Sequence, residues 1–135
     1  MFSHVFVGVS DFDRAFAFYA PLMSALGLKH RFSDLDRPWA GWQPATQDRP
    51  LFLIGRPFDA AAPAPGNGQM VAFLAADRAT VDRAHGLAIA QGGQSEGAPG
   101  LRPEYHENYY GAYFRDPDGN KLCVACHDPE DTGVS

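Results

Sequence analysis

The same order of secondary-structure signals occurs twice along the chain, and this repeat constrains the fold more than any other sequence feature. The first copy opens with an apolar strand, residues 1–9, followed by Ser10 and Asp13 at the spacing of a helix capping box. Apolar residues then recur every three or four positions up to Gly27, which is placed to end a helix. Three short apolar runs separated by turns predict an antiparallel meander: Leu28 to Phe32, Trp39 to Gln43 and Leu51 to Ile54.

The second copy begins after a stretch rich in Pro, Ala and Gly that has no periodicity and is expected to be a linker. Gln69 to Ala75 is an apolar strand, and Asp77 is placed to cap a helix from about Arg78 to Gln91. Gly92 ends this helix as Gly27 ends the first. Because the order of elements repeats although few residues are identical, we expect the repeat to decide the architecture.

The segment after the second helix is expected to be a loop, residues 94–103, followed by a hairpin. Asp116-Pro117-Asp118-Gly119-Asn120 has strong turn chemistry, with Pro after Asp and Gly two positions further on. Apolar runs flank this turn, and they predict one arm over residues 105–115 and a second arm from Lys121 to Cys126. The remaining polar residues, 128–135, are expected to form a frayed tail.

Length and charge place the chain among ordinary globular proteins. At 135 residues it is long enough for one domain with a single core, and its net charge is -5. No basic stripe is present, which argues against nucleic acid as a partner. No apolar run approaches the roughly 20 residues of a membrane helix, and no basic segment precedes an apolar stretch at the start. We therefore expect no membrane association and a cytoplasmic location.

The first strand contains a single imidazole among apolar residues. Because side chains alternate along a strand, the valines share one face and His4 shares the other with Phe6 and Gly8. The valine face is expected to lie under a helix, and the His4 face to line a cavity. His4 itself is either a structural residue satisfied by a hydrogen bond or a metal ligand.

The order of these elements resembles the vicinal oxygen chelate superfamily, which includes glyoxalase I, bleomycin-resistance proteins and extradiol dioxygenases. The resemblance covers roughly residues 2 to 127. It rests on four features of this sequence: the opening strand with His4, Phe18-Tyr19 with Leu26-Gly27, Gly66-Asn67-Gly68, and Tyr109-Tyr110-Gly111-Ala112 leading into Arg115-Asp116-Pro117-Asp118-Gly119-Asn120. No single feature is specific, but their order is.

The resemblance implies an α+β fold made of two tandem βαβββ modules whose mixed sheet curls into a ligand cup. On this basis residues 1–135 form one glyoxalase-like domain, with modules over residues 1–57 and 68–127, a linker over 58–67 and a polar tail over 128–135. The family also implies a small-molecule ligand and a homodimer, because the cup is commonly completed by pairing of two chains.

Metal-dependent members of the family hold a divalent cation with His and Glu from matched strands. In this sequence His4 matches the first ligand, whereas Met70 and Cys123 stand where His and Glu are usual. Zn, Mn, Fe or Ni is therefore expected only as a possible cofactor with one standard ligand, with Cys123 as a second candidate. Two functions stay open: a divergent lyase or dioxygenase acting on vicinal oxygens, and a metal-free protein that binds and sequesters a small molecule.

Further candidate residues gather in the run from Tyr105 to Tyr110, which leads from a loop into a strand of the cup. His106 is a candidate general acid or base, and Tyr110 a candidate donor to a substrate oxygen. The alternative is that these tyrosines fill the mouth of the cup or a dimer interface. The candidate substrate-binding residues are Trp42, Phe52, Met70, Arg102, Tyr105 and Tyr109.

Overall fold

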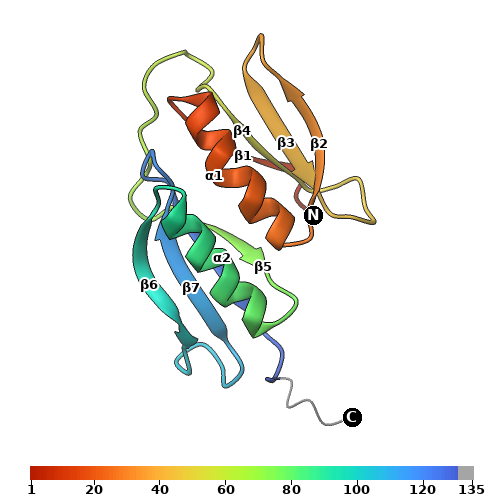
Figure 1. Ribbon diagram of the computed structural model, residues 1–135, viewed down its shortest axis with the longest axis vertical. Coiled ribbons are helices and arrows are strands. Elements are labelled where there is room, and N and C mark those ends of the chain that lie inside the picture. The colour runs from red at the N-terminus through yellow and green to blue at the C-terminus, as the bar shows by residue number, and fades with distance from the viewer. Residues whose placement is uncertain (131–135) are drawn as a thin grey trace.

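The computed structural model describes residues 1–130 and consists of two four-stranded sheets, each with one helix (Figure 1). The first module contains β1 (His4–Gly8), α1 (Phe12–Ala25), β2 (Lys29–Asp34), β3 (Trp39–Gln43) and β4 (Leu51–Gly55). The second contains β5 (Val71–Leu74), α2 (Arg78–Ala90), β6 (Gln94–Leu101), β7 (Tyr110–Arg115) and β8 (Lys121–Cys126). The expected α+β fold of two βαβββ modules is confirmed.

Strand order is the same in the two sheets, β1-β4-β3-β2 and β5-β8-β7-β6. β1 pairs in parallel with β4, and β5 pairs in parallel with β8, whereas the other neighbours are antiparallel. The predicted meander is therefore confirmed as β2, β3 and β4. Because β1 and β5 each pair on one side, each sheet ends in a free edge. The two sheets do not close onto each other.

Helix α1 begins one residue later than the capping-box pattern predicts. Asp11 is the N-cap, and its carboxylate accepts a hydrogen bond from the backbone N–H of Arg14. The hydroxyl of Ser10 instead donates to Asp118 at 2.6 Å. Asp77 caps α2 as expected, by accepting from the backbone N–H of Thr80. Gly27, which follows α1, has the positive φ of +76° that favours glycine.

The expectation of a loop over residues 94–103 is wrong for most of that range, because β6 covers Gln94–Leu101. The prediction relied on glycine and proline, which are weak strand formers. β6 nevertheless pairs along β7, and its register shifts between Ser95 and Gly97 and again between Gly97 and Gly100. These two register shifts allow β6, which is rich in glycine, to pair with the regular strand β7. The first hairpin arm is shorter than predicted, since β7 begins only at Tyr110.

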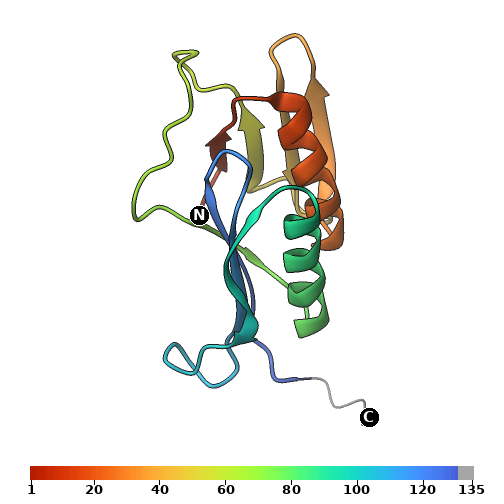
Figure 2. The same cartoon turned by 60° about the vertical axis from the view of Figure 1, so that its left-hand side comes forward.

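Both helices lie on one side of the two sheets, and the linker runs over the other side (Figure 2). The faces under the helices form the core, in which Phe18, Tyr19 and Phe114 are fully buried. Val7 and Val9 are buried in this core, so the predicted orientation of the valines is confirmed. No helix within residues 1–130 is long and apolar enough to cross a membrane.

The turn over residues 116–120 joins the two modules. The side-chain amide of Asn120 donates to the backbone oxygen of Gly8 at 3.0 Å. Asp118 accepts hydrogen bonds from both the backbone N–H and the hydroxyl of Ser10, and Arg14 reaches it at 3.3 Å. These contacts fix β1 relative to the start of β8 and thereby shape the groove between the modules.

Candidate functional site

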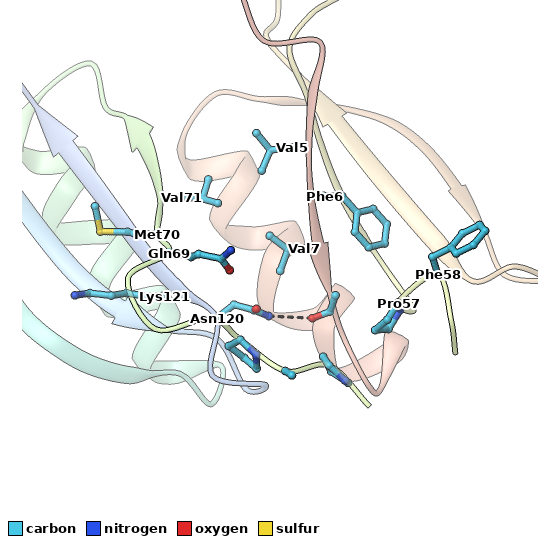
Figure 3. A pocket seen from close by; sticks show the side chains of 15 residues that line it. Val5, Phe6, Val7, Pro57, Phe58, Gln69, Met70, Val71, Asn120 and Lys121 are labelled. Carbon is cyan, nitrogen blue, oxygen red and sulfur yellow. Dashed lines mark hydrogen bonds between the residues drawn. The ribbon is translucent and has the colours of Figure 1, made fainter. Parts of the chain in front are cut away.

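A cavity of about 490 Å³ opens between the free edges of β1 and β5, on the side of the sheets that the helices leave open (Figure 3). Its walls come from β1, the linker, the residues just before β5 and the first residues of β8. Phe6 and Met70 contribute apolar side chains from the two modules. This volume is in the range of small-molecule sites in proteins.

The groove cavity also has three polar residues in its lining. They are Gln69, Asn120 and Lys121, and Figure 3 shows Asn120 bonded to the backbone of β1. The amide of Asn120 is therefore already engaged, while the ammonium group of Lys121 forms no ion pair with the residues that the structure describes. A cavity with apolar walls and a few polar groups fits a mainly apolar ligand, and the Lys121 side chain extends from this cavity (Figure 3) towards Tyr113.

A second cavity, of about 400 Å³, lies beside the first and brings together three of the predicted ligand residues, Trp42, Phe52 and Met70. Trp42 and Phe52 are nearly completely buried on the helix side of their sheet, where their rings contact Phe16 and Tyr19. Of these three residues, Met70 also lines the first cavity, and Val5 and Val71 border both cavities as well. Trp42 and Phe52 thus pack in the core and also border this second cavity.

The predicted residues His106, Tyr105 and Tyr109 meet on the open face of the second sheet. The ring of Tyr109 contacts both neighbouring rings, with centroids 4.9 Å from Tyr105 and 5.7 Å from His106. Nε2 of His106 lies 2.9 Å from Nδ1 of His127. Because Nδ1 of His106 accepts from the backbone N–H of Asn108, the proton of His106 is on Nε2, which donates to His127.

Three side chains form a hydrogen-bonded chain next to this cluster. The hydroxyl of Tyr109 lies 3.0 Å from that of Tyr113 and 3.5 Å from the sulfur of Cys123. Burial raises the pKa of Tyr109, and its hydrogen bonds to Tyr113 and Cys123 raise it further. Burial likewise raises the pKa of the Tyr113 phenol and of the Cys123 thiol. All three groups therefore keep their protons at neutral pH.

Tyr110 and His4, two other predicted residues, lie apart from the residues on the open face. The hydroxyl of Tyr110 donates to Asp82 of α2 at 2.6 Å, on the helix side of the sheet. This hydrogen bond raises the pKa of Tyr110 to about 12. His4 is exposed, its Nδ1 lies 2.9 Å from the hydroxyl of Ser3, and it lines neither cavity. Arg102 lies on the open face, near Tyr113.

The donor set at the family's metal positions does not fit a divalent cation. His4 pairs with Leu51 of β4, which offers no ligand atom. Met70 offers only a thioether. Cys123 would have to bind as a thiolate, but burial raises its pKa and its sulfur contacts Tyr109. Within residues 1–130, no group of three or more His, Cys, Asp or Glu side chains is placed to hold a metal ion.

Some residues of the site were not identified from the sequence. Lys121 and Gln69 were predicted only as parts of strands, and His127 only as the last residue of the second module. Alternation along β8 places Lys121 and Cys123 on one face and could have identified Lys121. No local pattern could have identified the contact between His106 and His127, because they are 21 positions apart in the sequence.

Comparison with known proteins agrees with this architecture. Residues 1–124 match the Glyoxalase/Bleomycin resistance protein/Dioxygenase superfamily. A glyoxalase/bleomycin resistance protein from Albidiferax ferrireducens is 33% identical, with a TM-score of 0.81 over 95% of this chain and 99% of that one. The chain belongs to this superfamily. No curated protein matches the sequence.

More distant solved structures share the fold. A glyoxalase-related enzyme from Fulvimarina pelagi is 17% identical, with a TM-score of 0.70 over 93% of this chain and 87% of that one. A lactoylglutathione lyase from Agrobacterium tumefaciens is 22% identical, with a TM-score of 0.61 over 93% and 92%. At these identities the likeness concerns the fold alone.

Proposed function

We propose that this protein binds a small, mainly apolar molecule in the groove cavity between β1 and β5, without a metal ion. The observation that carries the proposal is the cavity itself, of about 490 Å³, with Phe6 and Met70 on its walls. Phe6 and Met70 are large apolar side chains, and each leaves 45% of its surface exposed. Apolar surface that lines a concavity is the usual environment of an apolar ligand.

The chemistry of the available donors favours binding over metal-dependent lyase or dioxygenase activity. Such activity needs a Lewis acid held by several imidazole or carboxylate ligands. At the corresponding positions this chain offers His4, a thioether and a thiol whose pKa is raised by burial. Membership of the superfamily supports this proposal, because the superfamily includes the bleomycin-resistance proteins.

We also propose that the protein pairs with a second copy. Superfamily members often form dimers, and both sheets here leave one face uncovered by helices (Figure 2). Phe2, Leu74 and Leu101 are exposed apolar side chains of the two modules, and pairing would bury such surface. The cytoplasmic location stays a prediction from the sequence.

The experiment is a titration with N-phenyl-1-naphthylamine, an uncharged apolar dye whose fluorescence rises when it leaves water. The wild-type protein is expected to bind it, and Met70→Trp to weaken binding at least about tenfold by filling the groove. Ile89→Trp is the matched control, because Ile89 is similarly exposed, at 40%, and lies on α2 outside both cavities. Equal dye binding by the two variants, or none by the wild type, would overturn the proposal.

A further inference from the structure

Two glycines of β6 leave room for the Arg102 side chain to lie across the open face of the second sheet. A Cβ atom at Gly97 would lie 3.3 Å from Nη2 of Arg102, and one at Gly100 would lie 3.0 Å from Nη1. The irregular strand β6 thus leaves room for the guanidinium group. Nη2 donates to the backbone oxygen of Ala98 at 2.8 Å and Nη1 to that of Leu101 at 3.4 Å, which fixes its orientation.

This guanidinium group has no carboxylate partner among the residues that the structure describes. Its central carbon lies 5.6 Å from the ring centre of Tyr113, and the ammonium nitrogen of Lys121 lies 5.8 Å from the same ring. Two cations therefore approach the ring of one tyrosine in a protein whose net charge is -5. A fixed, unpaired guanidinium that retains free N–H groups is suited to a planar anion.

The hydrogen-bonded chain from Cys123 through Tyr109 to Tyr113 supplies a further donor. The three groups carry one proton each, and their two hydrogen bonds use two of these protons. One proton is therefore free to bond elsewhere. When Cys123 donates to Tyr109 and Tyr109 donates to Tyr113, the free proton is that of Tyr113. Arg102 and Lys121 both approach the ring that carries this hydroxyl, so an anion bound beside the ring would accept its proton.

The anion position is continuous with the groove cavity. Lys121 lines that cavity and also approaches Tyr113. From the groove outward, the strands follow in the order β5, β8, β7 and β6. Lys121 of β8 lies two positions from Cys123, the partner of Tyr113 on β7, and the Arg102 side chain extends back from the end of β6 to Gly97, which also pairs with Tyr113. A ligand with its apolar part in the groove would place an acidic group over Tyr113.

We propose that the open face of the second sheet binds a carboxylate through Arg102, Lys121 and the Tyr113 hydroxyl, and that the ligand of this protein is a small apolar carboxylic acid. This proposal rests on the proposed function, because it assumes that the apolar part of the ligand occupies the groove. A carboxylate has two coplanar oxygens that match the planar guanidinium fork.

The test compares benzoate with benzamide, its uncharged analogue of the same shape, by isothermal titration calorimetry. Wild-type protein is expected to bind benzoate at least about tenfold more tightly than benzamide. Arg102→Gln should remove that preference and leave benzamide binding unchanged. Arg83→Gln, which changes an exposed arginine of α2, is the matched control and should keep it. Tyr113→Phe keeps the ring and should weaken benzoate binding about three- to tenfold.

Each other outcome overturns the carboxylate site. Equal binding of benzoate and benzamide, or a benzoate preference that survives in Arg102→Gln, would remove the carboxylate site and leave the groove proposal intact. Tighter binding of phenyl phosphate than of benzoate, lost in Arg102→Gln, would replace the carboxylate by a phosphate. If benzamide, benzoate and the uncharged dye all fail to bind the wild type, the proposed function fails as well.

Discussion

The hydroxyl of Tyr19 on α1 donates to a carboxylate oxygen of Asp116 at 2.6 Å, and this contact joins the two modules through the core. Asp116 is the one buried charged residue within residues 1–130, with 4% of its surface exposed. Its two carboxylate oxygens also accept from the backbone N–H groups of Asp118 and Asn120 and from the Asn120 side chain. Asp116 thereby connects α1 to the turn that holds β1 beside β8.

Removal of the Tyr19 hydroxyl should destabilise the protein. In Tyr19→Phe, Asp116 stays buried and loses one hydrogen-bond donor, so the free energy of unfolding should fall by about 1–3 kcal/mol. Urea denaturation at neutral pH measures this change. Tyr105→Phe is the matched control, because Tyr105 is 64% exposed, and it should change stability by less than about 0.5 kcal/mol. Equal stability of Tyr19→Phe and wild type would show that this contact contributes nothing.

Two glycines in and beside α2 should respond oppositely to alanine. A Cβ atom at Gly86 would meet nothing within 4 Å, so Gly86→Ala should stabilise the helix by about 0.5–1 kcal/mol. A Cβ atom at Gly93 would lie 2.7 Å from the backbone oxygen of Arg115 and 2.8 Å from that of Ala88. Gly93→Ala should therefore lower stability by about 1–3 kcal/mol. Thermal unfolding of both variants checks the signs, and a stabilising Gly93→Ala would contradict the packing described.

The hydrogen bond from Tyr110 to Asp82 should make stability depend on alkaline pH. The pKa of Tyr110 is raised from its ordinary 10.0 to about 12, first by this hydrogen bond and then by burial. Below pH 10 both folded and unfolded chains keep the phenol proton, so the stabilisation is complete. From pH 10 to about 12 only the unfolded chain ionises, and the stabilisation is lost as pH rises.

Tyr110→Phe removes this contribution. The stability difference between wild type and Tyr110→Phe, measured by urea denaturation, should be constant up to about pH 10 and shrink above it. Tyr105→Phe serves as control, because Tyr105 is largely exposed. A difference between wild type and Tyr110→Phe that grows above pH 10 would have the wrong sign for this hydrogen bond.

The loop before β7 should depend on the imidazole pair. Nε2 of His106 donates to His127, and Nδ1 of His106 accepts from the backbone N–H of Asn108. His127→Phe keeps a ring against Tyr109 but removes the acceptor. Hydrogen exchange of the Asn108 amide should then become several-fold faster, while amides of α1 are unchanged. Unchanged exchange at Asn108 would show that the pair does not order this loop.

The sequence predicts most of the fold because its signals are local. Glycines at the helix ends, Asp77 at a helix start and the Asp-Pro-Asp-Gly turn each act within a few residues. β6 was missed because its strand conformation comes from pairing with β7 and not from its own residues. The start of α1 shifted to Asp11 because a distant partner, Asp118, binds the hydroxyl of Ser10.

Prediction of the candidate site was less complete, for the same reason. Met70, Arg102 and Tyr109 lie on the open side, and their role in ligand binding stays a prediction. The bonding of Tyr110 to Asp82 and of His106 to His127 depends on which elements lie side by side. The room that Gly97 and Gly100 leave for Arg102 depends on irregular pairing of β6, which no periodic pattern reveals.

Ligand binding without a metal ion is tested most directly by the dissociation constant of N-phenyl-1-naphthylamine in the presence of EDTA and after addition of Zn²⁺, Mn²⁺, Fe²⁺ or Ni²⁺. Because the groove is built from apolar walls and Lys121, the constant should be the same in chelator and in each metal, within about twofold. Loss of binding in EDTA, restored by one of these ions and absent in His4→Ala, would contradict a metal-free site.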